Sequence, residues 1–389
     1  MTVTMMRTHP LTSPLMFQAL CLLSALVIFA LPARAQDAPP SLAANAWLLL
    51  DHATGQILAS EKADERIEPA SLTKLMTAYV VFTAIREGKL RGDQQVPVSP
   101  AAWKTPGSRM FIEPKKPVTV DELVRGMIVQ SGNDACIALA EAVAGSEAAF
   151  VERMNREAQR LGLSNTRFAN ATGLPAARHY STARDLAYLA RAIIRDFPEF
   201  YPIYSTREYT YNGIKQPNRN RLLWLDPTVD GVKTGYTQAA GYCLISSARR
   251  GARRLIAVVL GAAAENLRVQ ESLKLLHYGY TAFDAVKLYD KDQALAQLTV
   301  YKGSPGSIAV GFTDDFVVSL PRGSAEKVRV ELKSRHPLIA PVTRGQQVAT
   351  LKVYLGNQLW GEYPVLALAD APVAGVFGRA WGALRLWLQ

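Results

Sequence analysis

Strand-forming sequence stands at both ends of residues 46–285, and this order constrains the fold more than any other feature. The segment "AWLLLDHATGQILAS" (46–60) is typical of two strands joined by a glycine-containing turn, and "GYCLISSARRGARRLIAVVLGA" (241–262) of a second hairpin. Between them the apolar residues recur at helical spacing, with a capping-box pattern at Thr119 and Glu122. This order predicts an α+β fold in which one antiparallel sheet is covered by a helical cluster.

The sequence changes character from about residue 286. Short apolar runs such as "KVRVELK" and "QVATLKVYLGN" follow one another through residues 286–370, split by Gly, Pro, Asp and Asn. This pattern predicts a small all-β domain. It contains no cluster of catalytic side chains, so its simplest role is that of a spacer or a binding platform.

The tail, residues 373–389, is rich in tryptophan and arginine and has no acidic residue. If it is helical, one stripe carries Phe377, Trp381, Leu384 and Leu388, and Leu386 falls outside that stripe. The pattern predicts an amphipathic helix that lies in a membrane surface. The alternative is a helix that packs on its own domain.

Residues 1–35 have the composition of an export signal. Arg7 precedes an apolar run, and small residues at Ala33 and Ala35 suit cleavage by an export peptidase. The run is shorter than the roughly 20 residues that a membrane-spanning helix needs. We therefore expect cleavage after Ala35 and a mature protein outside the cytoplasm.

Composition narrows the function further. Hydrophobic residues make up 49% and charged residues 20% of the 389-residue chain, as in globular proteins. The net charge is +11, but the basic residues are spread along the chain, so we expect no nucleic-acid partner. No Cys/His spacing suits a metal, and we expect no metal site and no cofactor. Cys136 and Cys243 could pair after export, although two buried free thiols are the alternative that we favour.

Three short motifs carry the chemistry. Ser71 precedes Lys74 by three residues in "EPASLTKLMTAY", at an expected helix start. Ser324 and Lys327 repeat that spacing without companions, so the spacing alone decides nothing. Ser71 is distinguished by Ser-Gly-Asn at 131–133, at a break between helices, and by Lys-Thr-Gly at 233–235, opening an edge strand. Together they form a complete acyl-transfer site.

Each motif residue has a physical task. One helical turn puts Ser71 and Lys74 on the same face, so the amine can take the hydroxyl proton. Lys74 can do so only when neutral, and we expect burial and the nearby Lys233 cation to lower its pKa. Ser131 can relay a proton to the leaving amine, and the Asn133 amide can hold the substrate backbone.

The third motif suits the end of a substrate. Lys233 and Thr234 can bind a terminal carboxylate, and Gly235 allows the edge strand to approach the serine closely. The backbone N–H groups of Ser71 and Tyr236 are the expected oxyanion donors.

In these motifs and their surroundings ("QSGNDACIALAE", "QPNRNRLLW", "VDGVKTGYTQAAGY") the chain resembles the low-molecular-mass penicillin-binding proteins, specifically the D-alanyl-D-alanine carboxypeptidases. The resemblance implies a serine β-lactamase/D,D-peptidase-like domain at 42–285, a small β domain at 286–370 and an anchoring helix at 373–389. It implies removal of the terminal D-alanine from the peptidoglycan pentapeptide stem, with β-lactams as covalent inhibitors. It also implies a periplasmic location, with peripheral attachment to the inner membrane.

By position, the resemblance makes Ser71 the nucleophile and Lys74 the general base. It adds Arg219 and Arg268 as residues that hold or position the substrate carboxylate, although each could equally be a solvated arginine. The segment 101–114 is shorter than the corresponding loop of familiar members, which leaves the deacylation rate and substrate preference open.

Three other functions are compatible with parts of this pattern. A β-lactamase would need a water-activating pair such as Glu208 and Asn212, but "REYTYNGIK" alternates like a strand and the spacing is interpreted as accidental. A D,D-endopeptidase would use the same residues on cross-linked peptides. A non-catalytic wall-binding protein would have a degenerate site, and none of the three motifs is degenerate.

Overall fold

The computed structural model describes residues 38–334 and 336–387 of the chain. The predicted export signal, residues 1–35, and Leu388 of the predicted apolar stripe lie outside the described residues. Within the described ranges, no helix has both the length and the apolar character needed to cross a bilayer.

Five antiparallel strands form the central sheet, in the order β2-β1-β9-β8-β7. The strands are β1 (Ala46–Asp51), β2 (Ile57–Glu61), β7 (Val229–Thr237), β8 (Gly241–Arg250) and β9 (Arg253–Ala262). Because β1 pairs with β9, the two ends of this region share one sheet, as the sequence predicted. Strand β7 lies at the edge, so one side of its backbone is left unpaired by the sheet.

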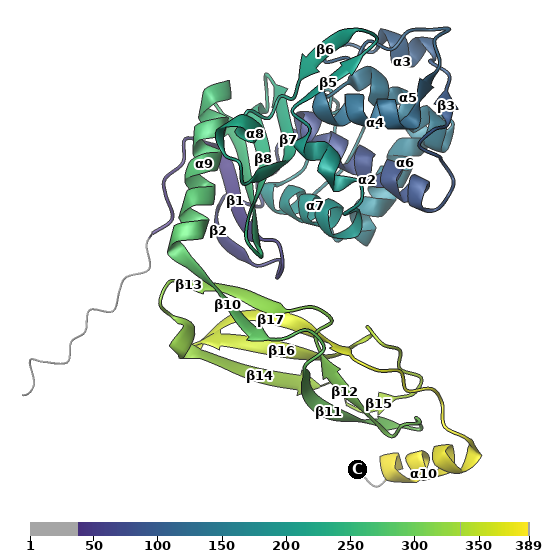
Figure 1. The fold of residues 1–389 in the computed structure, drawn as a ribbon, viewed down its shortest axis with the longest axis vertical. Helices are drawn as coiled ribbons and strands as arrows, with labels where there is room; N and C mark the ends of the chain where they lie inside the picture. The colour runs from purple at the N-terminus through teal and green to yellow at the C-terminus, as the bar shows by residue number, and fades with distance from the viewer. Residues whose placement is uncertain (1–37, 335, 388–389) are drawn as a thin grey trace, which may run out of the picture. The chain divides into compact units, whose positions relative to one another are not determined.

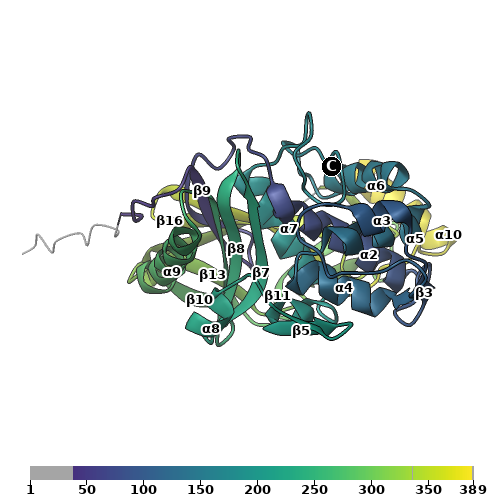
Figure 2. The same cartoon turned by 90° about the horizontal axis from the view of Figure 1, so that it is seen from above.

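Strand β1 is buried on both of its faces. Leu48 and Leu50 belong to the core shared with the helical cluster, whereas Trp47 and Leu49 belong to the core beneath α9 (Glu265–Ala282). Successive strand residues point to opposite faces, so a continuous apolar run marks a strand covered on both sides. Figure 2 shows the sheet between α9 and the helical cluster, which confirms the predicted α+β class.

The chain between β2 and β7 forms the helical cluster (Figure 1). Its helical elements are η1 (Ala70–Thr73), α2 (Lys74–Arg86), α3 (Pro100–Lys104), α4 (Val120–Val129), α5 (Asn133–Ala144), α6 (Glu147–Arg160), α7 (Ala183–Asp196) and η2 (Tyr201–Ser205). Two short hairpin-like pairs accompany them: β3 (Gln95–Val96) with β4 (Val118–Thr119), and β5 (Glu208–Tyr211) with β6 (Ile214–Pro217). The short helix α8 (Leu222–Leu225) lies on the other side of the sheet, where Leu222 and Leu223 belong to the core beneath α9. The predicted capping box of Thr119 and Glu122 is present at the start of α4.

The C-terminal part consists of strands followed by one helix (Figure 1). The elements are β10 (Phe283–Tyr289), β11 (Ala294–Tyr301), β12 (Ser307–Gly311), β13 (Phe316–Pro321), η3 (Ala325–Lys327), β14 (Val328–Ser334), β15 (Leu338–Ile339), β16 (Gln347–Leu355), β17 (Gln358–Ala367) and α10 (Val376–Trp387). The strands before α10 enclose a core of their own, as expected for an all-β domain. The first strand starts at Phe283, slightly before the predicted change near residue 286.

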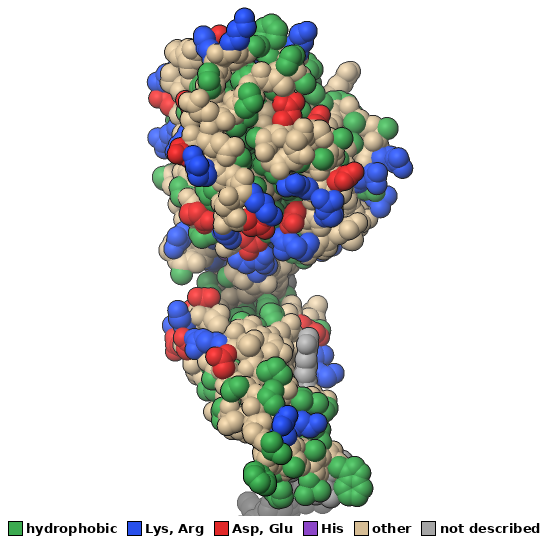
Figure 3. Space-filling view, turned by 90° about the vertical axis from the view of Figure 1, so that its right-hand side faces the viewer, with side chains coloured by type: hydrophobic (Ala, Val, Ile, Leu, Met, Phe, Trp, Pro, Cys, Tyr) green, Lys and Arg blue, Asp and Glu red, His purple; other side chains and the backbone are tan. Residues whose placement is uncertain are grey.

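Helix α10 contacts its own domain along one narrow face. Gly382 is buried, and a Cβ there would lie 2.6 Å from the backbone nitrogen of Lys302. Leu386, one turn further on, is half-buried. The opposite stripe stays in solvent, with Phe377 93% and Trp381 63% exposed. Leu386 therefore falls outside the apolar stripe because it faces the β strands. Figure 3 shows hydrophobic side chains gathered at the foot of the view, where α10 lies.

Candidate active site

Ser71 lies in the short 3₁₀ turn η1, directly ahead of α2. The turn begins at Ala70, whose φ of 48° is in the left-handed region that non-glycine residues seldom adopt. Lys74 opens α2 and is only 2% exposed. Its Nζ lies 2.9 Å from Ser71 Oγ, so the amine reaches the hydroxyl as the spacing predicted.

Two further oxygen atoms surround the Lys74 amine. Nζ lies 2.7 Å from Asn133 Oδ1 and 2.5 Å from the backbone oxygen of Thr172. An amide or carbonyl oxygen can only accept a hydrogen bond, whereas a serine hydroxyl can also donate one. A neutral Lys74 amine satisfies all three neighbours in one way: its two N–H bonds point to Asn133 and Thr172, and its lone pair points to the hydroxyl of Ser71.

The electrostatic surroundings favour the neutral form of this amine. Burial lowers the pKa of Lys74 to about 8, the Arg219 guanidinium acts in the same direction, and Asp134 opposes it. The expected coupling between the Lys74 and Lys233 amines is present, because a charge on one amine disfavours a charge on the other. Burial also holds the pKa of Lys233 well below its ordinary value, with Lys74 as the next cause.

Ser131 and Lys233 form a second pair beside the first. The chain breaks between α4 and α5, where Ser131 takes a left-handed φ of 65°. Lys233, 3% exposed, extends from β7 and donates from Nζ to Ser131 Oγ at 2.9 Å and to the Thr234 carbonyl at 3.1 Å. The break and the edge strand thus bring the second and third motifs together, as predicted.

Gly235 allows the edge strand to reach the serine turn. A Cβ at Gly235 would lie 3.2 Å from both Leu72 Cγ and the Pro69 carbonyl oxygen, and 3.3 Å from the Ala70 Cβ. These distances are tighter than ordinary side-chain contacts. The structure therefore supports the predicted reason for a glycine at this position.

Both predicted arginines border the site. Arg268 is 5% exposed, pairs with Glu265 at 2.9 Å and donates to the Gly235 carbonyl at 3.4 Å. Arg219 donates from Nε to the backbone oxygen of Gln130, next to Ser131, at 3.3 Å. Arg268 is therefore a buried cation beside the edge strand, whereas Arg219 is exposed at the rim and is held by this one hydrogen bond.

A cavity of about 200 Å³ joins these groups. It is lined by Ser71, Ser108, Ser131, Arg219, Thr234, Gly235, Tyr236, Tyr242, Glu265 and Arg268. The predicted residues Lys74, Asn133 and Lys233 lie directly behind this lining, hydrogen-bonded to Ser71, Lys74 and Ser131 respectively. The Tyr236 ring, 53% exposed, packs against Tyr242 in a tilted arrangement with ring centroids 4.4 Å apart.

Several other sequence features lie elsewhere. Glu208 pairs with Lys215 on the β5–β6 hairpin and Asn212 bonds to Glu113, so they do not form a water-activating pair at Ser71. Ser324 donates to the Pro321 carbonyl in a turn after β13. Cys136 and Cys243 are buried free thiols. In the described ranges, no group of His, Cys, Asp and Glu side chains could hold a metal ion.

Comparison of the sequence with known proteins shows to which family the chain belongs. A family model described as D-alanyl-D-alanine carboxypeptidase matches residues 33–264, and one described as penicillin-binding protein 5, C-terminal domain, matches residues 283–372. The chain is 43% identical over 350 residues to D-alanyl-D-alanine carboxypeptidase DacC of Escherichia coli strain K12, covering 88% of each protein. This chain belongs to the D-alanyl-D-alanine carboxypeptidase family.

Solved structures of low-molecular-mass penicillin-binding proteins share this architecture. Penicillin-binding protein 5 from Haemophilus influenzae is 39% identical, with a TM-score of 0.77 over 86% of this chain and 99% of that one. Penicillin-binding protein D2 from Listeria monocytogenes, solved in an ampicillin-bound form, is 33% identical, with a TM-score of 0.58 over 63% of this chain and 100% of that one. Family membership thus extends to a carboxypeptidase domain followed by the C-terminal β domain.

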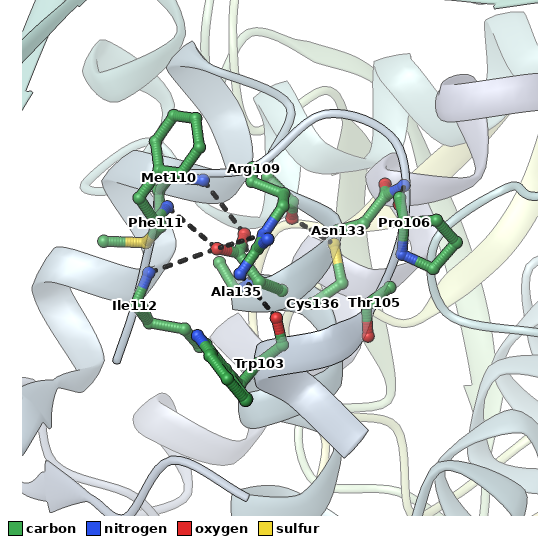
Figure 4. Close-up of polar contacts among 12 residues, drawn as sticks. Trp103, Thr105, Pro106, Arg109, Met110, Phe111, Ile112, Asn133, Ala135 and Cys136 are labelled. Atoms are coloured by element: carbon green, nitrogen blue, oxygen red, sulfur yellow. Dashed lines mark hydrogen bonds and ion pairs between the residues drawn. The ribbon is translucent and has the colours of Figure 1, made fainter. Parts of the chain in front are cut away.

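One carboxylate that sequence analysis did not single out organises the rim of this penicillin-binding protein. Asp134 is fully buried in the first turn of α5. Its two oxygens accept the backbone N–H groups of Met110 and Phe111 at 2.9 Å and of Ile112 at 3.2 Å. Figure 4 shows these three backbone nitrogens converging on α5. An acidic residue beside Asn133, opening an otherwise apolar helix, was the available signal.

The same loop fixes the orientation of the Asn133 amide. Asn133 Nδ2 donates to the Pro106 carbonyl at 2.7 Å, and its backbone N–H donates to the Ser108 carbonyl at 2.7 Å. Since Nδ2 is held by the loop, Oδ1 is the atom that faces Lys74. The segment 101–114, which the sequence marked only by its short length, therefore fixes the direction of the Asn133 amide.

Proposed function

We propose that this protein is a serine-type D-alanyl-D-alanine carboxypeptidase that removes the terminal D-alanine from peptidoglycan pentapeptides through an acyl-Ser71 intermediate. One observation carries the proposal: a buried amine, that of Lys74, lies 2.9 Å from Ser71 Oγ at a cavity lined by positive groups. A nucleophilic serine next to a lysine base, with cations for a substrate carboxylate, is the arrangement that acyl transfer at a chain end requires.

In the acylation step, Ser71 Oγ attacks the carbonyl carbon of the penultimate D-alanine while its proton passes to the Lys74 lone pair. The negative charge that develops on the carbonyl oxygen is accepted by the backbone N–H groups of Ser71 and Tyr236, each typically worth roughly 3 kcal/mol. The C–N bond then breaks, and the leaving amine takes a proton through Ser131. Water hydrolyses the ester and regenerates Ser71.

Substrate binding uses the positive side of the cavity. Lys233, Thr234 and the two arginines Arg219 and Arg268 bind or orient the terminal carboxylate, and the Asn133 amide contacts the substrate backbone through the second hydrogen of Nδ2. β-Lactams present a carboxylate and a strained amide to the same groups, so they acylate the same serine.

Labelling with a fluorescent penicillin tests the assignment of the nucleophile. The full chain should be labelled and should release free D-alanine from isolated pentapeptide muropeptides, and Ser71→Ala should lose both activities. Ser324→Ala is the matched control, because Ser324 has the same spacing to a lysine and should leave labelling unchanged. Absence of labelling in the parent protein would overturn the proposal. Rapid multiple turnover of a cephalosporin, or split muropeptide dimers in place of free D-alanine, would point to the rival enzymes.

The pH dependence of acylation tests the role of Lys74. Only the neutral amine can accept the serine proton, so the acylation rate should rise about tenfold per pH unit and level off above the Lys74 pKa of about 8. Arg219→Gln removes a cation that lowers this pKa, so the rising limb should move to higher pH. A flat acylation profile from about pH 6 to 9 would contradict a lysine base.

We further propose that residues 1–35 direct export, that the mature protein is periplasmic, and that α10 holds it on the outer face of the inner membrane. Support comes from the exposed aromatic stripe of Phe377 and Trp381, a combination that fits the interfacial layer of a bilayer. Gly382 docks the other face on the β strands, which leaves this stripe free to face lipid.

Deletion of residues 373–389 should release the protein into the soluble fraction and leave activity on soluble peptides unchanged. Phe377→Ser with Trp381→Ser should weaken binding to phospholipid vesicles in a flotation assay. Trp224→Ser, which removes a tryptophan that is 45% exposed on α8, should not. Full membrane retention of the truncated protein would place the anchor elsewhere.

A further inference from the structure

Residues 169–174 form a turn that touches the catalytic lysine, although this segment contains none of the three motifs. The Thr172 carbonyl accepts a hydrogen bond from Lys74 Nζ at 2.5 Å, and the Ala171 carbonyl accepts one from Thr77 Oγ1 at 2.7 Å. Both contacts run to the first turn of α2. The turn therefore supplies one of the three oxygens that surround the Lys74 amine.

The Asn170 side chain makes four hydrogen bonds within this turn, and Glu147 of α6 adds one by accepting the Ala171 backbone N–H at 2.9 Å. Asn170 Oδ1 accepts from the backbone N–H of Thr172 at 3.1 Å, from Thr172 Oγ1 at 3.1 Å and from the backbone N–H of Gly173 at 2.7 Å. Asn170 Nδ2 donates to the Leu174 carbonyl at 2.8 Å. An asparagine that bonds to the backbone two and three residues further on is an effective turn-former.

The serine turn confines the other side of the segment. Gly173 has a φ of 87°, and a Cβ there would lie 1.8 Å from the Ala70 carbonyl oxygen. The backbone at Gly173 thus lies against the residue that precedes Ser71. With one side against η1 and the other held by Asn170, the Thr172 carbonyl has a fixed position relative to both Ser71 and Lys74.

We propose that Asn170 is a positioning residue for the lysine base: it holds the Thr172 carbonyl where that carbonyl takes one N–H of Lys74 and leaves the lone pair directed at Ser71. The inference rests on the proposed function. If the Thr172 carbonyl moves away, the freed N–H turns to the remaining acceptor, Ser71 Oγ. The lone pair then no longer faces the proton that must be removed, and acylation slows.

The location of Asn170 makes the idea testable without unfolding the site. The side chain is only half-buried and borders a cavity of about 190 Å³ that also contacts Thr105 and Glu147. Asn155, which lies on α6 and bonds to the chain just ahead of the turn, provides a matched control. Its amide makes three hydrogen bonds, to the Val151 carbonyl and to the Phe168 carbonyl and N–H, but it does not contact the turn at 170–174.

The experiment measures fluorescent-penicillin acylation of the full chain, separating the dissociation constant from the acylation rate constant, across pH for Asn170→Ala, Asn170→Asp and Asn155→Ala. Asn170→Ala should lower the acylation rate constant at least about tenfold with an unchanged dissociation constant, because only the base is disoriented. Asn170→Asp keeps the accepting oxygen and should recover the high-pH rate to within about threefold. Its added charge should move the rising limb to higher pH. Asn155→Ala should stay within about twofold of the parent.

Equal rates for Asn170→Ala and Asn155→Ala would overturn the inference, as would equal slowing by Asn170→Ala and Asn170→Asp. Thermal unfolding of each variant shows whether slower acylation comes from a general loss of structure. If Asn170 had only a structural role, the acylation rate constant of Asn155→Ala would fall together with that of Asn170→Ala. A parent protein that is not labelled would instead refute the proposed function. A labelled parent with a parent-like Asn170→Ala variant would refute only the positioning role.

Discussion

A lysine amine that loses its water on burial is stable inside a protein only where other oxygens replace the water, and Lys74 meets this condition at three atoms. Two of them, Asn133 Oδ1 and the Thr172 carbonyl, can only accept, and the third belongs to Ser71. Burial makes the neutral amine accessible near neutral pH, and the two acceptors give it a direction. Without either acceptor, the lone pair of the amine would no longer be directed at Ser71.

The fold brings three segments that are distant in sequence next to the Lys74 amine. The helical cluster contributes η1 and the break between α4 and α5, and the sheet contributes its edge strand β7. An exposed edge strand can pair with other chains and so favours aggregation. In β7 the Lys-Thr-Gly motif at 233–235 instead borders the site cavity. The glycines at 173 and 235 allow two backbones to approach the serine turn from either side. Small residues at these positions are therefore part of the site's geometry.

The sequence predicts those parts of this arrangement that depend on which side chains are present and on the spacing between them. The alternating and continuous apolar runs predicted the antiparallel sheet, and motif spacing predicted the pairing of Ser71 with Lys74 and of the Ser-Gly-Asn break with the Lys-Thr-Gly strand. It could not identify the Thr172 carbonyl, because a backbone acceptor has no sequence signature. Nor could it show that the Arg219 guanidinium also lies where it lowers the pKa of Lys74. The same limit applies to Leu386, whose departure from the apolar stripe makes sense only once Gly382 is seen against Lys302.

Time-resolved mass spectrometry of the acyl-enzyme tests directly whether Ser71 forms a covalent intermediate. The full chain is mixed with a peptide ending in D-alanyl-D-alanine, quenched at intervals and digested, while free D-alanine is measured in the same samples. We expect an acyl adduct on the peptide that contains Ser71, formed together with the release of D-alanine. An adduct on another residue, or D-alanine release that persists in the Ser71→Ala variant, would contradict acylation of Ser71.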